Sequence, residues 1–328
     1  MKLLPGLVVA GFGRHVLVET PAGERLICHP RGKKSAAVVG DRIQWQPTQD
    51  EGTIEKIETR KNLFYRQDEV RTKSFAANLD QVLILIAAEP EFSESQLSRA
   101  LIAAEAEHIM PIIALNKSDL TEPFAKAWVR LMPYRDMGYE VISLALKPKM
   151  PPQTPSVQPS TTQIPADEPM VPAKDVPIQI EGLMALLQGK TTLVLGPSGA
   201  GKSTLINALV PQAQVFTQEI SQALNSGKHT TTSTTWYWVD AAKTTALIDS
   251  PGFQEFGLNH IEAMHLASYM PDFKVHVPNC KFYNCSHLHE PGCGVLESMK
   301  NDSSRYKISL ERYRIYSSLF AELSETRY

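Results

Sequence analysis

The chain has 328 residues, a length that fits two or three domains. Hydrophobic residues make up 43% and charged residues 21%, which allows a buried core and excludes a wholly disordered or collagen-like chain. The formal net charge of −2, taken alone, argues against a strongly basic nucleic-acid-binding protein.

The first 75 residues contain short apolar stretches separated by glycine-rich and charged turns. Strands are expected over residues 6–10, 16–19, 25–29, 36–39, 41–45 and 52–57. This spacing is typical of a small five-stranded barrel of the OB type. We interpret the start of the chain as a strand and not as a signal peptide, because Pro5 and Gly6 interrupt its apolar residues.

This N-terminal region is more basic than the chain as a whole. It holds 13 Lys and Arg against 9 Asp and Glu, a net charge of +4, so the remaining residues sum to −6. OB barrels bind nucleic acids through grooves lined by cations and aromatic rings. The candidates are Arg31, Lys33, Lys34, Trp45, Phe64 and Tyr65. The alternative is a solvated basic loop with aromatic side chains in the core.

From about residue 78 onward, continuous apolar segments alternate with helical patterns. Strands are expected over residues 81–87, 111–115, 139–143, 191–195 and 244–248, and a helix over 95–108. This alternation indicates a parallel α/β sheet. Residues 148–177 interrupt it with nine of the 23 prolines, and we expect a disordered insertion there. The longest apolar run, residues 82–88, is too short to span a membrane.

Residues 196–203 match the phosphate-binding loop G-x-x-x-x-G-K-[ST]. The match follows an expected strand, and a helix is expected to begin near Ser203. Backbone N–H groups and the helix N-terminus would therefore face a phosphate. Lys202 is placed to reach the β- and γ-phosphates, and the Ser203 hydroxyl to bind Mg²⁺.

The tetrapeptide Asn116-Lys117-Ser118-Asp119 directly follows another expected strand. The Asp119 carboxylate can accept hydrogen bonds from the N1–H and the exocyclic amine of guanine, an edge that adenine lacks. Asn116 can contact the base and brace the loop, and the Lys117 stem can lie along the ring. This motif therefore predicts guanine recognition.

A D-x-x-G motif, residues 249–252, follows the strand expected over 244–248. Asp249 is placed to hold Mg²⁺ through water, and the Gly252 N–H to contact the γ-phosphate. Residues 227–232, Gly-Lys-His-Thr-Thr-Thr, offer hydroxyl groups for the remaining Mg²⁺ position. This loop is interpreted as a switch that the γ-phosphate and the metal order together.

Three of the four cysteines gather near the C-terminus, in the pattern C-x₄-C-x-H-x₅-C formed by Cys280, Cys285, His287 and Cys293. Three thiolates and one imidazole make a closed tetrahedral zinc site with no open position for catalysis. His265 and His289 are nearby alternatives for the fourth ligand. Cys28 stands alone in the barrel and is expected in its core.

A helical segment near the C-terminus also carries cations. Its side chains Arg305, Tyr306, Lys307, Arg312 and Arg314 are expected to face either RNA or solvent.

The order of the motifs is unusual for a GTPase, because guanine recognition precedes the phosphate-binding loop. In this order the chain resembles the RsgA (YjeQ) family of circularly permuted GTPases, which depend on the small ribosomal subunit. The resemblance extends to Arg31-Gly32-Lys33, Val39-Gly40-Asp41, Arg60-Lys61-Asn62 and Ala77-Asn78-Leu79-Asp80-Gln81, and leaves out only the proline-rich insertion. The family pattern places the fourth zinc ligand at His287.

The resemblance implies a multi-domain architecture. Its parts are an OB-type RNA-binding barrel over residues 1–75, a circularly permuted P-loop α/β GTPase domain over 76–257 and a mostly helical zinc-binding domain over 258–328. It further implies hydrolysis of GTP to GDP and phosphate, stimulated by the small ribosomal subunit during its late maturation. The protein would bind rRNA and be released on hydrolysis. We expect a cytoplasmic monomer with one structural Zn²⁺, and Mg²⁺ bound with GTP.

The expected site residues follow from these matches. For GTP they are Asn116, Lys117, Ser118, Asp119, Ser143, Gly196, Pro197, Ser198, Gly199, Ala200, Gly201, Lys202, Ser203, Thr204, Asp249 and Gly252. For Mg²⁺ they are Ser203, Thr231 and Asp249, and the catalytic candidates are Lys202, Thr231 and His229.

Two positions depart from common GTPase patterns. Where the family usually has Ser-Ala-x-Thr-Gly, this chain has Ser-Leu-Ala-Leu at residues 143–146, so base contacts from Ser143 and Leu144 remain an expectation. Phe253 occupies the position of a water-orienting glutamine, so intrinsic hydrolysis should be slow. His229, beside the switch threonines, is our candidate for orienting water.

Two other classes of function are compatible with parts of this pattern. An RNA-binding adaptor could use its nucleotide site only to tune affinity, and subunit-dependent phosphate release would distinguish it from an enzyme. A P-loop ATPase or kinase would share the phosphate-binding loop, but Asp119 argues against it.

Overall fold

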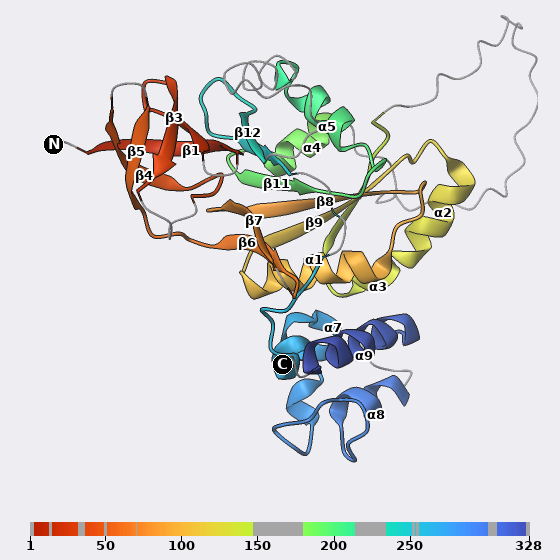
Figure 1. The fold of residues 1–328 in the computed structure, drawn as a ribbon. Coiled ribbons are helices and arrows are strands. Elements are labelled where there is room, and N and C mark those ends of the chain that lie inside the picture. The colour runs from red at the N-terminus through yellow and green to blue at the C-terminus, as the bar shows by residue number, and fades with distance from the viewer. Residues whose placement is uncertain are drawn as a thin grey trace, which may run out of the picture.

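The structure is a computed structural model that describes residues 3–12, 15–31, 37–48, 51–69, 71–146, 180–213, 234–250, 253, 256–300 and 307–325. An N-terminal barrel lies at one end of a central α/β unit, and a smaller C-terminal unit lies below one face of its sheet (Figure 1). The predicted fold class is confirmed.

Five strands close the barrel: β1 (Leu4–Phe12), β2 (His15–Glu19), β3 (Arg25–Pro30), β4 (Arg42–Pro47) and β5 (Gly52–Ile57). They pair in the order β1-β2-β3-β5-β4, and β4 returns to β1, which closes the barrel. Alternate side chains point inward. The core contains Val8, Val16, Val18, Cys28, Ile43, Trp45 and Ile54. Cys28 is therefore a core residue, and Trp45 belongs to the core and not to an exposed groove.

The strand expected over residues 36–39 is wrong. Its described residues, 37–39, lead into a turn in which the Val38 amide donates to the Asp41 carboxylate (2.8 Å) and the Asp41 amide donates to the Val38 carbonyl (3.1 Å). A short polar side chain that accepts from the backbone in this way competes with strand pairing. Arg60 donates to both oxygens of the buried Asp41 carboxylate (2.7 and 2.8 Å), which compensates its charge.

The central sheet contains five parallel strands in the order β10-β9-β8-β11-β13. Their bounds are β8 (Gln81–Ala87), β9 (Met110–Asn116), β10 (Glu140–Ser143), β11 (Thr191–Leu195) and β13 (Ala246–Asp249). β12 (Thr235–Trp238), which was not predicted, adds antiparallel to β13 and pairs through Thr235 with Ala10 of β1. The barrel thus continues the sheet at its edge.

Helices cover both faces of this sheet, and successive side chains of each buried strand point alternately to one face and the other. In β8, Val82, Ile84 and Ile86 join the core under α1 (Glu94–Ala106), α2 (Thr121–Arg130) and α3 (Met132–Asp136). Leu83, Leu85 and Ala87 join the core under α4 (Ile180–Leu187) and α5 (Lys202–Leu209). The C-terminal unit lies on the α1 face (Figure 1).

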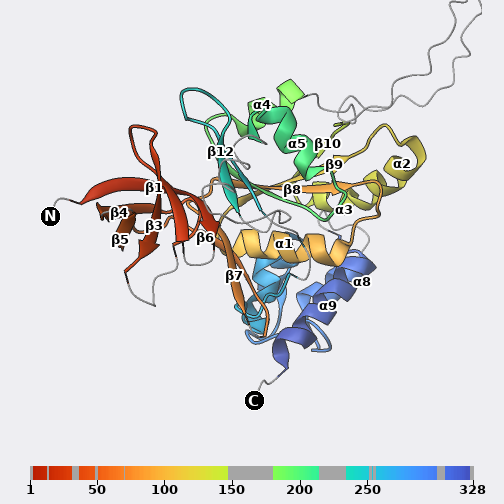
Figure 2. The same cartoon turned by 45° about the horizontal axis from the view of Figure 1, so that its top comes forward.

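A hairpin of β6 (Leu63–Gln67) and β7 (Thr72–Ala77) runs beside α1 toward the C-terminal unit (Figure 2). Phe64 is buried against Phe256, with ring centroids 5.7 Å apart. The Gln67 amide donates to the Gly257 carbonyl (3.0 Å), and its carbonyl accepts from the Asn259 amide (2.9 Å). The hairpin therefore holds the segment that connects the D-x-x-G region to the C-terminal unit.

The C-terminal unit contains the short helical segments η2 (Ala263–Tyr269), α7 (Pro271–Lys274), η3 (Val277–Asn279) and α8 (Gly294–Lys300), followed by the longer helix α9 (Leu310–Ser324). One face of α9 buries Ile315, Tyr316, Leu319 and Phe320. Within the ranges described, no helix has the length and apolar composition needed to cross a membrane.

Candidate nucleotide-binding site and metal centre

The phosphate-binding loop connects β11 to α5, as its sequence predicts. A Cβ on Gly196 would lie 2.3 Å from the Leu85 carbonyl oxygen, and one on Gly201 would lie 2.4 Å from Nδ2 of Asn116. Gly201 also has a φ of +104°, which a side chain would strain. Glycine is therefore required for the loop to turn tightly between neighbouring strands and present its backbone N–H groups to an anion.

The guanine motif follows β9, whose carboxyl end lies at the same edge of the sheet as that of β11. Asn116 is buried and joins three loops. Its Nδ2 donates to the Ala200 carbonyl of the phosphate-binding loop (2.9 Å), and its Oδ1 accepts from the Leu146 amide (3.2 Å). Lys117 has a φ of +67° and donates from Nζ to the Glu89 carbonyl. The tertiary structure thus connects two motifs that are 84 residues apart.

These two loops enclose a cavity of about 500 Å³, a volume within the range of small-ligand sites. It is lined by Asn116, Lys117, Asp119, Leu120, Leu146, Pro197, Ser198, Gly199, Gly201, Lys202, Ser203 and Thr204. The cavity therefore has a carboxylate at one end, where guanine binding is predicted, and a phosphate-binding loop at the other.

The loop that departs from the family pattern is nevertheless placed beside the base-recognition motif. The Leu144 amide donates to the Leu115 carbonyl (2.8 Å), and the Ser118 amide donates to the Leu144 carbonyl (3.0 Å). The side-chain oxygens of Ser118 and Ser143 are buried without a hydrogen-bond partner in the described structure. Neither side chain is among those that line the cavity, so these hydroxyl groups are assigned no contact with a ligand.

Asp249 lies near the phosphate-binding loop at the end of β13. Its Oδ1 is 3.8 Å from Nζ of Lys202, which also donates to the Ser250 carbonyl (3.0 Å). Burial raises the pKa of Asp249, while Lys202 opposes the shift. Oδ1 is buried without a hydrogen-bond partner in the described structure. A buried carboxylate oxygen beside the phosphate-binding loop suits a hard cation such as Mg²⁺.

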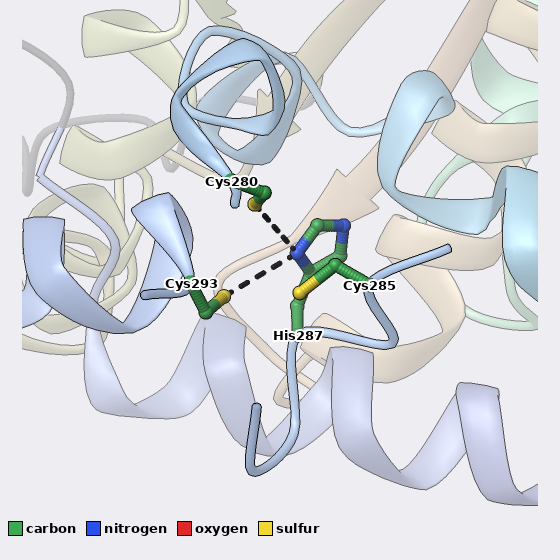
Figure 3. Close-up of side chains that lie close together, drawn as sticks. All are labelled: Cys280, Cys285, His287 and Cys293. Atoms are coloured by element: carbon green, nitrogen blue, oxygen red, sulfur yellow. Dashed lines mark hydrogen bonds between the residues drawn. The ribbon is translucent and has the colours of Figure 1, made fainter. Parts of the chain in front are cut away.

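The four predicted zinc ligands converge in the C-terminal unit (Figure 3). Nδ1 of His287 lies 3.5 Å from the sulfur atoms of both Cys280 and Cys293, and all four ligand atoms lie within 4.8 Å of one another. Ligand atoms around tetrahedral zinc are about 3.5–3.8 Å apart, given bonds of about 2.3 Å to sulfur and about 2.0 Å to nitrogen. The residues therefore fit a metal ion. The alternative ligand His265 instead lies 3.4 Å from Glu262, and neither it nor His289 belongs to the cluster.

Neighbouring groups orient this cluster. The Gly294 amide donates to the Cys280 sulfur (3.3 Å), and the Tyr313 hydroxyl donates to the His287 carbonyl (3.0 Å). Burial raises the pKa of Cys285 to about 12 and lowers that of His287, so without a metal the thiol and the imidazole are neutral. Metal binding would then displace the thiol proton.

Glu290 was not predicted to contribute to this centre. Its carboxylate accepts from the Ser286 amide (2.7 Å) and from the amides of Leu288 and His289 (both 3.2 Å). Burial opposes ionisation, but the bonds from Ser286 outweigh it and bring the pKa of Glu290 to about 2. Glu290 therefore holds the turn that carries His287 by accepting from its amides. The sequence signal for this role was an acidic residue between two of the metal ligands.

The remaining predicted residues either fall outside the described part of the chain or belong to neither the nucleotide cavity nor the metal cluster. His229, Thr231, Gly252, Lys33, Lys34, Arg305, Tyr306 and the insertion 148–177 are outside the described residues. Arg31 is exposed and pairs with Glu55 (2.6 Å). Phe64 is buried in the core, as the alternative interpretation expected.

Arg312 faces neither RNA nor solvent, so that expectation is wrong. It is 2% exposed, donates to both carboxylate oxygens of Asp272 (2.8 and 2.9 Å), and reaches the Ser98 hydroxyl of α1 (2.7 Å). Its position on the buried side of α9 depends on this ion pair, which the sequence pattern does not reveal.

Together, the sheet and the cavity define a P-loop GTPase whose guanine motif precedes its phosphate-binding loop, which is a circularly permuted GTPase. The sequence matches the family described as RsgA GTPase over residues 57–164 and 166–259. The chain therefore belongs to the RsgA GTPase family.

Similar proteins cover nearly the whole chain. It is 66% identical over 323 residues to the small ribosomal subunit biogenesis GTPase RsgA of Variovorax paradoxus, covering 98% of this chain and 93% of the relative. The corresponding protein of Paraburkholderia phytofirmans is 46% identical over 325 residues, with the same coverage.

Two crystal structures are also similar. That of YjeQ from Thermotoga maritima has a TM-score of 0.68 and 28% identity, covering 99% of this chain and 100% of that chain. That of YloQ, described as a circularly permuted GTPase, has a TM-score of 0.65 and 24% identity, and covers 100% of this chain and 98% of that chain. At 24% identity, the similarity to YloQ supports the fold alone.

Proposed function

We propose that this GTPase acts in late maturation of the small ribosomal subunit, which stimulates its hydrolysis of GTP to GDP and phosphate. The observation that carries the proposal is that one cavity is lined by both the guanine motif and the phosphate-binding loop. The two similar bacterial relatives are named small ribosomal subunit biogenesis GTPases, which supports the choice of partner.

The roles of the chain's residues follow from the chemistry of the nucleotide. Asp119 accepts from the guanine edge, and Asn116 positions its loop against the phosphate-binding loop. Lys202 and the backbone N–H groups of residues 196–203 stabilise the phosphate charge. Ser203, Asp249 and Thr231 would hold Mg²⁺, which when bound neutralises charge on the β- and γ-phosphates.

Slow intrinsic hydrolysis is part of the proposal. Phe253 has no group that could orient water, and its ring is 4% exposed. Activation would therefore come from the threonine-rich loop once the subunit orders it, with His229 orienting water. In single-turnover assays, we expect His229→Ala to reduce subunit-stimulated hydrolysis. Undiminished stimulation would rule out that role.

We also propose a GTP-dependent clamp. The barrel (1–75) and the zinc-binding unit (258–328) would bind rRNA while GTP occupies the central domain (76–257), and release it after hydrolysis. Support comes from the contacts of Gln67 with Gly257 and Asn259, which join the start of the C-terminal unit to the hairpin that follows the barrel in the chain. Equal subunit affinity with GDP and with a non-hydrolysable GTP analogue would contradict the clamp.

The metal centre has a structural role in this scheme, because three thiolates and one imidazole leave no open position at zinc. A cytoplasmic monomer that contacts the subunit directly completes the proposal.

The deciding experiment is phosphate release from GTP with and without purified small subunits. We expect stimulation by small subunits but not by large subunits, and its loss in Lys202→Ala. Equal rates with and without small subunits would contradict the proposed function.

A further inference from the structure

The loop between the first two metal ligands carries two neighbouring aromatic side chains toward solvent. Tyr283 is fully exposed (102%), and Phe282 is 42% exposed. Nζ of Lys281 lies 5.7 Å from the Phe282 ring centroid, within cation–π distance. We call residues 281–283 the aromatic tip.

The backbone that carries the aromatic tip is held in place on both sides. Cys280 and Cys285 bracket the loop and both belong to the metal cluster. The Lys281 amide donates to the Gly292 carbonyl (2.9 Å) on the opposite side of the turn. Because this backbone is constrained, the exposed rings lose less conformational entropy when a partner binds them.

The charge near the tip favours an anionic partner. The acidic residue of the ligand-bearing turn, Glu290, directs its carboxylate inward to the amides of Ser286, Leu288 and His289. Lys281 is left exposed beside the rings. An exposed ring next to an exposed ammonium group matches a nucleotide, whose base offers a flat π-face and whose phosphate is anionic.

Resting on the proposed function, we propose that the aromatic tip stacks against an unpaired base of the small-subunit rRNA. Tyr283 supplies the stacking face, and Lys281 contacts the adjacent phosphate. Unpaired bases in loops and bulges are the parts of folded RNA that aromatic side chains can reach.

The test compares three variants for binding to small subunits in the presence of a non-hydrolysable GTP analogue. We expect Tyr283→Leu, which keeps apolar bulk but loses the π-face, to weaken binding roughly 5- to 150-fold. Tyr283→Phe should bind as wild type because it keeps the ring. Lys281→Gln should reduce the slope of the logarithm of the binding constant against the logarithm of the salt concentration, by the amount expected for about one phosphate contact.

Metal content and subunit-independent hydrolysis should stay unchanged in all three variants, which checks that they fold. A photo-reactive phenylalanine analogue at position 283 should cross-link to rRNA. Cross-links to ribosomal protein alone, or equal binding by Tyr283→Leu and Tyr283→Phe, would overturn the proposal. If wild-type protein is neither bound nor stimulated by small subunits, the proposed function itself fails, which is a distinguishable result.

Discussion

Asn116, which is predicted to contact the base, braces the loops of the cavity in this structure. Its amide group joins the phosphate-binding loop at Ala200 to the loop at Leu146, from a buried position. The neighbouring Asp119 lines the cavity. One short motif therefore supplies both the brace, which is Asn116, and the side chain predicted to recognise the base, which is Asp119.

We predict that the base preference depends on the Asp119 carboxylate, which lines the cavity. We expect Asp119→Asn to weaken guanine-nucleotide binding and to shift preference toward xanthine nucleotides, because an amide can donate to the oxygen that replaces the exocyclic amine. Competition binding of GTP against xanthosine triphosphate measures the shift. Asp136→Asn, an exposed aspartate on α3, is the control. Unchanged guanine preference in Asp119→Asn would show that other residues select the base.

Arg312 and Asp272 form a buried ion pair that attaches α9 to α7 and α1. Removing one partner leaves an uncompensated buried charge, so we expect Arg312→Met to destabilise the protein by about 3–5 kcal/mol. Adding Asp272→Asn should recover part of that loss. Urea unfolding followed by circular dichroism measures both variants. Arg314→Met is the control, since Arg314 is 75% exposed and should change little.

Glu19 connects elements of two parts of the molecule. It lies on β2 of the barrel and accepts from Trp238 on β12 (2.9 Å) and from Lys243 in the following turn (2.6 Å). Burial alone would raise the pKa of Glu19, but the bonds from Lys243, Trp238 and Arg25 outweigh it and hold the pKa below its ordinary 4.5.

This lowered pKa makes the junction sensitive to acid. The stabilisation is fully present above the unfolded pKa of 4.5 and is lost as the pH falls through the lower folded value. We expect Glu19→Gln to cost about 1–3 kcal/mol at neutral pH, and the difference from wild type to shrink below pH 4.5. Urea unfolding at several pH values, with the exposed Glu24→Gln as control, measures it. A difference that does not change with pH would contradict this account.

The hairpin β6–β7, the segment near Gly257 and the C-terminal unit meet on the α1 face of the central sheet. The hairpin β6–β7 contacts the segment at Gly257, and Arg99 of α1 donates to the Phe256 carbonyl (3.2 Å) and to Glu322 of α9 (2.9 Å). The C-terminal unit is therefore docked on α1 as well as linked through the chain. Any movement of this unit after hydrolysis must involve these contacts.

Metal removal tests how far the C-terminal unit acts as a separate part. We expect a chelator that extracts zinc to abolish subunit stimulation while leaving slow intrinsic hydrolysis, because the nucleotide cavity contains no residue of the metal cluster. Cys285→Ser should behave in the same way. Measured zinc content and phosphate release, with restoration by added zinc, provide the readout. Equal loss of intrinsic hydrolysis would show that the metal also maintains the central domain.

Residues that are neighbours in the chain made much of this protein predictable. The phosphate-binding loop, the Asn-Lys-Ser-Asp motif and the cysteine cluster each carry their chemistry within a few residues, and continuous apolar segments predict the parallel strands. Their spacing is a local property, so no tertiary contact is needed to recognise it.

Contacts between distant residues depend on packing that local patterns do not contain. The burial of Arg312 against Asp272, the inward direction of Glu290 and the attachment of Asn116 to Ala200 each require partners from other segments or a folded turn. The strands β6 and β7 were not predicted from the sequence, and they are stabilised by pairing with each other and by the contact of Phe64 with Phe256. A charged side chain or short strand takes its role from the partner that folding brings to it, whereas a motif carries its role in its own residues.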